Sequence, residues 1–119
     1  MKKIDIANQV IGLFFSQENK EQRSKLAEAF ETEGAIVRTI KDEKELELIM
    51  ADEGPGRPRA IIFDSTVFPI KTAEALVDAK IEPVCVTMLP KGARVIPGES
   101  REIGTFVQNV LNKEMQPVG

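Results

Sequence analysis

The chain has 119 residues, a length typical of one domain built around one hydrophobic core. Apolar residues make up 42% and charged residues 29%, a composition that excludes collagen, coiled coil and extended disorder. The net charge is −3 with acids and bases interspersed, so we expect no nucleic-acid partner. His, Trp and Tyr do not occur, which excludes His-based catalysis and imidazole metal sites.

No apolar stretch in the sequence is long enough for a signal peptide or a membrane span. We therefore expect a cytoplasmic location and no membrane partner. The one cysteine, Cys85, lies in the apolar run 84–86, where a small buried hydrophobe is the expected role.

Short apolar runs alternate with amphipathic segments through the first part of the chain. Residues 10–15 (VIGLFF) are continuously apolar, which predicts a strand covered on both faces. A polar stretch with an apolar helical stripe follows and ends at Gly34, which predicts the first helix. Residues 35–40 (AIVRTI) predict a second strand, placed near a sheet edge because Arg38 interrupts it.

The middle of the chain continues this alternation. Asp42 is predicted to cap a second helix, with Glu45 as its capping-box partner. The turn-rich segment 54–58 (GPGRP) ends that helix, and residues 60–63 (AIIF) predict the third strand. The buried stripe of the second helix is predicted to contain Leu46, Ile49 and Met50.

A third helix and a fourth strand complete the repeated pattern. Pro69 suits the first turn of the helix, and residues 83–89 (PVCVTML) predict the strand. The inward residues of the helix are predicted to include Ala73, Leu76 and Val77. Three strand–helix–strand units imply right-handed crossovers, so we predict an α/β three-layer sandwich with a mostly parallel central sheet.

The end of the chain departs from this pattern. Only residues 90–93 separate the fourth strand from the apolar segment 94–96, whereas a parallel connection needs about a dozen residues. We predict an antiparallel hairpin here, with an irregular piece over the sheet edge as the alternative. Ser100 is predicted to cap a final helix, which packs on the sheet through Ile103, Phe106, Val107, Val110, Leu111 and Met115.

The whole chain, 1–119, is predicted to form a single domain with flexible ends at 1–8 and 116–119. In a parallel sheet the loops after the strands form the natural site. That places residues 16–19, 64–66 and 87–89 on one rim.

The order of elements resembles the receiver domains of bacterial response regulators, which have a flavodoxin-like fold. The family's phosphoryl-accepting Asp ends its third strand, a position that matches Asp64 in AIIFDST. Its switch Thr or Ser ends the fourth strand and matches Thr87 in PVCVTML. Its Mg²⁺-holding acid cluster falls on residues 17–19 (QEN), where Glu18 is the one acid. The resemblance thus implies Asp64 as candidate phosphoacceptor, Glu18 and Asp64 as candidate metal ligands, and Thr87 as candidate switch.

The sequence also departs from the family. The Lys that precedes a Pro after the fifth strand is missing, since Ile96 stands before Pro97, and Lys91 is the alternative ammonium. The short connection after Leu89 means that the family's fourth helix is missing. Each of the candidate site residues also has an ordinary structural explanation. Asp64 can accept a hydrogen bond from the backbone that follows it, and the negative charge of Glu18 is favourable near a helix N-terminus. Thr87 has the β-propensity expected of a strand residue.

These departures predict a pseudo-receiver, a non-catalytic regulatory domain of two-component signal transduction. It has no catalytic residues and no cofactor, and it binds a protein partner or forms a homodimer, for which we favour the side of the shortened fourth strand. One alternative is a working receiver in which Asp64 accepts a phosphoryl group with Mg²⁺. Another is a small flavodoxin-like ligand-binding protein.

Overall fold

The computed structural model describes residues 6–52, 54, 56–67, 70–89, 92–96 and 101–115. Its elements in chain order are β1 (Val10–Phe14), η1 (Gln17–Asn19), α1 (Lys20–Thr32), β2 (Ile36–Thr39), α2 (Glu43–Ala51), β3 (Ala60–Asp64), η2 (Ser65–Val67), α3 (Ile70–Asp78), β4 (Glu82–Leu89), β5 (Gly92–Ile96) and α4 (Arg101–Met115).

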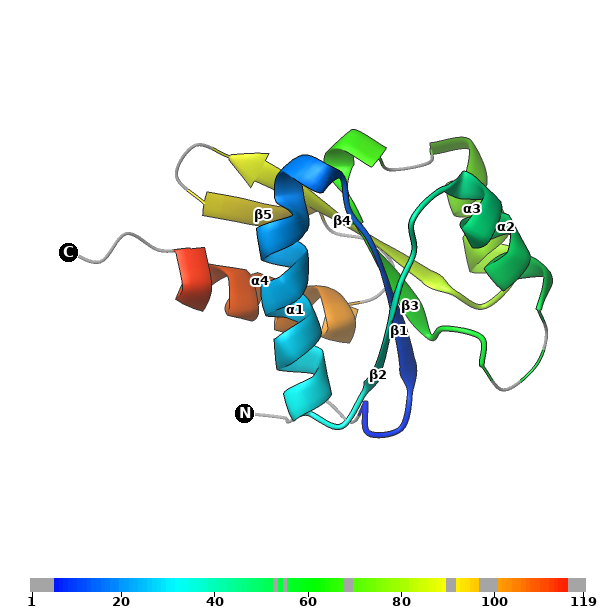
Figure 1. Cartoon of the computed structure of the whole chain (residues 1–119), viewed down its shortest axis with the longest axis horizontal. Coiled ribbons are helices and arrows are strands. Elements are labelled where there is room, and N and C mark those ends of the chain that lie inside the picture. The colour runs from blue at the N-terminus through cyan, green and yellow to red at the C-terminus, as the bar shows by residue number, and fades with distance from the viewer. Residues whose placement is uncertain are drawn as a thin grey trace.

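The strands form one sheet in the order β2-β1-β3-β4-β5 (Figure 1). β2, β1, β3 and β4 run parallel to their neighbours, as the repeated strand–helix–strand pattern predicts. β5 pairs with β4 in the antiparallel direction, with Leu89 opposite Gly92 and Cys85 opposite Ile96. The predicted hairpin is confirmed, since this register leaves only residues 90 and 91 between the paired strands. The α/β sandwich prediction is confirmed with it.

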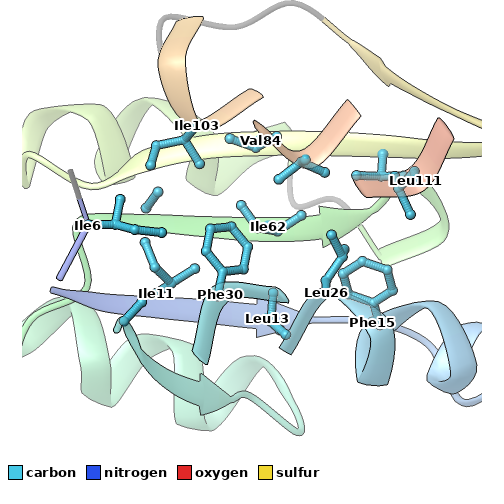
Figure 2. Packing of buried hydrophobic residues seen from close by; sticks show 14 residues of the cluster. Ile6, Ile11, Leu13, Phe15, Leu26, Phe30, Ile62, Val84, Ile103 and Leu111 are labelled. Carbon is cyan, nitrogen blue, oxygen red and sulfur yellow. The ribbon is translucent and has the colours of Figure 1, made fainter. Parts of the chain in front are cut away.

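Helices cover both faces of the sheet, α1 and α4 on one and α2 and α3 on the other (Figure 1). Figure 2 shows Leu26 and Phe30 of α1 and Ile103 of α4 packing toward Ile62 at the centre of the sheet. Side chains alternate between the two faces along β1: Leu13 contributes to the α1/α4 core, whereas the next residue, Phe14, contributes to the α2/α3 core. The α2/α3 core is smaller and consists of Phe14, Ile40, Leu46, Ile49, Ile61, Phe63, Leu76 and Ile81.

Gly12 in β1 permits a close approach on the α2/α3 side. A Cβ at this position would lie 3.0 Å from Cγ1 of Ile61 and 3.1 Å from Cδ1 of Ile40. The two isoleucine side chains therefore occupy the space above the glycine. A glycine in this strand therefore leaves room for the two isoleucine side chains to pack against the backbone.

The predicted helix boundaries are set by identifiable residues. Asp42 caps α2, because its Oδ1 accepts from the backbone N–H of Glu45 at 2.8 Å. The carboxylate of Glu45 in turn accepts from the backbone N–H of Lys41 at 3.3 Å. Gly34 follows α1 with a φ of 87°, a conformation that favours glycine. The predicted edge position of the second strand is also confirmed.

Arg57, in the turn-rich segment after α2, ties together the ends of two helices. Its guanidinium donates to the carbonyl of Ala79 at 2.8 Å, that of Met50 at 3.1 Å and that of Asp52 at 3.0 Å. These carbonyls lie at the C-terminal ends of α2 and α3, where a cation is favoured by the helix dipole. The segment thus fixes α2 against α3.

Two side-chain predictions need correction. Val77 is 37% exposed rather than inward, because Leu76 alone of that pair turns into the core. Cys85 is only half-buried, and burial, aided by the nearby charge of Asp64, raises the pKa of its thiol. The stripe of α4 is confirmed at Ile103, Val107 and Leu111, which are buried.

Several predictions concern residues outside the described part. They are the flexible ends 1–5 and 116–119, Pro69 as a helix start, Ser100 as a cap, Lys91 and Pro97, and the side chain of Met115. In the described N-terminal residues, Ile6 is buried and the N–H of Asn8 donates to the carbonyl of Gly34 at 2.9 Å.

Candidate functional site

Two of the three predicted rim loops meet at the carboxylate of Asp64. Its Oδ2 accepts from Ser16 twice, from the hydroxyl at 2.6 Å and from the backbone N–H at 3.2 Å. The side-chain amide of Asn19 donates to the same oxygen. Oδ1 accepts from the backbone N–H of Thr66 at 3.1 Å. Asp64 is completely buried, and the loop between β1 and α1 is folded around it.

The strand pattern accounts for this placement. Side chains alternate along β3, so Asp64 lies on the same face as Ala60 and Ile62, beneath α1. The loop after the neighbouring parallel strand β1 ends at the same edge and supplies Ser16 and Asn19. The bond from Thr66 is the local Asx-type contact considered as an alternative role for Asp64.

The environment of Asp64 favours its ionised form. Burial alone raises the pKa of a carboxyl group, but the hydrogen bonds from Asn19, Ser16 and Thr66 outweigh burial and hold the pKa of Asp64 below its ordinary value. Asp64 is therefore a carboxylate at neutral pH, and hydrogen bonds from neutral donors stabilise its negative charge.

This donor set does not fit a Mg²⁺ ion. Mg²⁺ requires oxygen ligands in near-octahedral geometry, usually one or two carboxylates with waters. Oδ2 instead faces three N–H or O–H donors, one of them the amide nitrogen of Asn19, which carries no lone pair for a metal. Glu18 is exposed on η1, and the described hydrogen bonds to Asp64 come from Ser16, Asn19 and Thr66 instead. Within the described residues no group of three acids or thiols could hold a metal.

Thr87 is not brought together with Asp64. Asp64 pairs with Val86 of β4, whose side chain is buried in the α1/α4 core. Because side chains alternate along a strand, Thr87 lies on the opposite face of the sheet from Asp64. Its neighbour across the hairpin is Arg94 of β5. The predicted site residues therefore occupy three separate environments: buried Asp64, exposed Glu18, and Thr87 on the far face.

The sequence analysis placed residues 16–19 at the rim but did not single out Ser16 or Asn19. One signal was available, since a buried carboxylate without a basic partner needs neutral donors. Ser and Asn in the adjacent loop are residues of that kind.

Comparisons with known proteins bear on the fold alone. No protein-family model and no curated protein matches the chain. A solved structure described as a heterocyclase in complex with substrate and cofactor is similar, with a TM-score of 0.53 and 12% sequence identity. The match covers 78% of this chain and 12% of the heterocyclase chain, so this chain corresponds to a small part of that protein. Among the described residues, no helix is long and apolar enough to cross a membrane.

Proposed function

We propose that this chain is a non-catalytic regulatory domain of the pseudo-receiver type, which acts in the cytoplasm by binding another protein. The observation that carries the proposal is that the Asp64 carboxylate is completely buried and hydrogen-bonded at both oxygens. Each of its oxygens accepts hydrogen bonds from groups fixed by the fold, and three donors converge on Oδ2.

A phosphoryl-accepting carboxylate needs one oxygen free to attack phosphorus and a cation to neutralise the crowded charge. At Asp64 the donors of Ser16 and Asn19 occupy Oδ2, the N–H of Thr66 donates to Oδ1, and the residue is completely buried, so neither oxygen is open to an incoming phosphoryl group. Accepting a phosphoryl group would break these bonds and displace the start of α1. We therefore assign Asp64 an anchoring role, in which it joins the end of β3 to the loop before α1.

The hairpin supports the same proposal. Because β5 returns antiparallel directly after β4, no crossover helix separates these two strands. A receiver's output surface includes such a helix, as the resemblance implies. Any signal from this domain must therefore use another surface, which favours an altered protein-binding role.

The proposal is tested by incubating the protein with acetyl phosphate and Mg²⁺ and measuring the intact mass. We expect an unchanged mass for the wild type, with an active receiver domain as positive control. A mass increase of one phosphoryl group that disappears in Asp64→Asn would support the phosphoaccepting alternative instead.

A further inference from the structure

β2 offers an unpaired strand edge whose orientation is defined by its bonds to β1. The backbone N–H of Ile36 donates to Gln9 at 2.8 Å, and that of Ile40 donates to Leu13 at 2.9 Å. Alternate residues of a strand bond the same neighbour, so the backbone groups of Val37 and Thr39 point away from the sheet. In the part of the chain that the structure describes, no strand pairs with β2 on that side (Figure 1).

This edge is short and carries one charged residue, two devices that limit strand pairing, but it lacks others. Sheet edges are usually protected by proline, bulges or inward-pointing charges. β2 contains no proline, and its register with β1 is continuous from residue 36 to 39. Ile36 is 55% exposed and is one of three exposed large hydrophobic residues among those described. Arg38 is the one charged residue of the strand.

The position of Arg38 selects one way for two copies to pair. Related by a twofold axis, two β2 strands run antiparallel, and an axis at Arg38 would place the two guanidinium side chains directly opposite each other. Like charges in that position are destabilising. An axis at Val37 instead places Arg38 opposite Ile36 of the second copy, so that its aliphatic stem covers the exposed isoleucine.

The Val37 register would also pair the N–H and C=O of Val37 and the N–H of Thr39, while the C=O of Thr39 stays unpaired because the Ala35 N–H opposite it is already bonded. Val37 exchanges both its N–H and its C=O with Val37 of the second copy. The N–H of Thr39 donates to the carbonyl of Ala35 of the second copy, whose own N–H is already bonded to Phe30 at 3.0 Å. An axis at Thr39 would use residues 40–42, which lie beyond the strand.

We propose that this protein forms a homodimer in which two β2 strands pair antiparallel about Val37 and extend the sheet across both copies. The proposal rests on the interaction role assigned above and names its partner as a second copy. It moves the predicted dimer contact from the fourth-strand side, where β5 now covers β4, to the opposite edge. Because the strand is short, we expect a weak, concentration-dependent dimer rather than an obligate one.

Sedimentation velocity across a concentration series tests the dimer. We expect the wild type to shift from monomer toward dimer as concentration rises and Val37→Pro to remain monomeric. Proline removes the outward N–H of Val37. The hydrogen bonds to β1 stay in place, because they are made by the backbone groups of Ile36 and Arg38 and not by those of Val37. Val37→Thr, which keeps that N–H, serves as the matched control and should still dimerise. A wild type that stays monomeric throughout overturns the proposal.

Cysteine cross-linking tests the register without relying on the proline variant. In a Cys85→Ser background, an equal mixture of Ile36→Cys and Arg38→Cys chains should form the mixed disulfide dimer on mild oxidation. Directly opposite positions of this type lie about 4.5 Å apart between Cα atoms, within the range for a disulfide. Failure of the mixed disulfide to form, although the Ile36→Cys and Arg38→Cys chains still dimerise in sedimentation, overturns the register. A monomeric protein that also resists acetyl phosphate would refute the dimer while leaving the regulatory role intact.

Discussion

The side-chain amide of Asn19 donates to the carboxylate of Asp64, joining the start of α1 to the end of β3 across 45 positions of sequence. Asn19 occupies the segment in which the family resemblance places a metal-binding acid. The ligand expected in this segment was Glu18, whereas Asn19 supplies a hydrogen-bond donor, and neutral donors stabilise the local charge without a cation. The anchoring role of Asp64 follows from this contact and from the two bonds made by Ser16.

Asp64→Asn is expected to destabilise the fold by about 3 kcal/mol, because buried donors of Ser16 and Asn19 lose a charged acceptor. Chemical denaturation at neutral pH measures the loss. Asp52→Asn is the matched control, since the Asp52 carboxylate makes an exposed turn bond to Gly54. We expect the control to change the unfolding free energy by less than about 0.5 kcal/mol. Equal effects of the two substitutions would contradict the anchoring role.

The contribution of Asp64 is expected to depend on pH. The pKa of this carboxyl is lower in the folded protein than in the unfolded chain, so its stabilising effect is complete above the ordinary value near pH 4. The effect is lost as the pH falls below that value through the folded pKa. The stability difference between wild type and Asp64→Asn should therefore be constant near neutrality and shrink in acid. A difference that grows on acidification would contradict this.

Asn19→Asp is expected to create the acid pair that the sequence lacks. Two carboxylates would then share the space now joined by a hydrogen bond, so we expect a lower melting temperature without divalent ions. Added Mg²⁺ should recover part of the loss, because a cation relieves the repulsion. Gln17→Asp adds the same charge at an exposed position and should show no Mg²⁺ effect. Wild-type protein stabilised by Mg²⁺ to the same extent would contradict our account of the site.

Arg57→Ala is expected to cost about 2 kcal/mol of unfolding free energy, since the carbonyls of Met50, Asp52 and Ala79 lose a charged donor. Arg57→Lys should recover only part of this, because an ammonium cannot reproduce the planar fork of donors. Denaturant unfolding of both variants gives the comparison. Full recovery by lysine would mean that charge alone, rather than the three-carbonyl geometry, matters.

Gly12→Ala is expected to destabilise by about 1 kcal/mol, because its Cβ would crowd the side chains of Ile61 and Ile40. Gly56→Ala is the matched control, since a Cβ there meets nothing within 4 Å. Thermal unfolding should place Gly56→Ala at or above the wild type and Gly12→Ala below it. The reverse order would show that the α2/α3 core adjusts without cost.

Much of the architecture follows from local pattern. The strand edge at β2 was predictable from Arg38, and the antiparallel return of β5 was predictable from chain length, because four residues cannot span a parallel crossover. The capping of α2 by Asp42 was predictable from its spacing to Glu45. Each of these depends on neighbouring residues or on steric reach.

The site was less predictable because it depends on contacts distant in sequence and on side-chain direction. Nothing local indicates that Asn19 donates to Asp64, or that Arg57 reaches the ends of two helices. Thr87 lies within β4, which continues to Leu89, and the pleat turns it to the other face from Asp64. Val77 was misplaced for a similar reason, since a short helix leaves the choice between adjacent apolar residues to packing.

The most direct test of the central claim is an NMR titration that follows the Asp64 carboxyl carbon and the Asn19 side-chain amide during addition of Mg²⁺ and beryllofluoride. We predict that both signals stay unchanged, because the carboxylate is already held by Ser16, Asn19 and Thr66. A saturable shift of both signals in the wild type, with no shift of the Asn19 amide in Asp64→Asn, would show that the carboxylate accepts a phosphoryl mimic and would contradict the account.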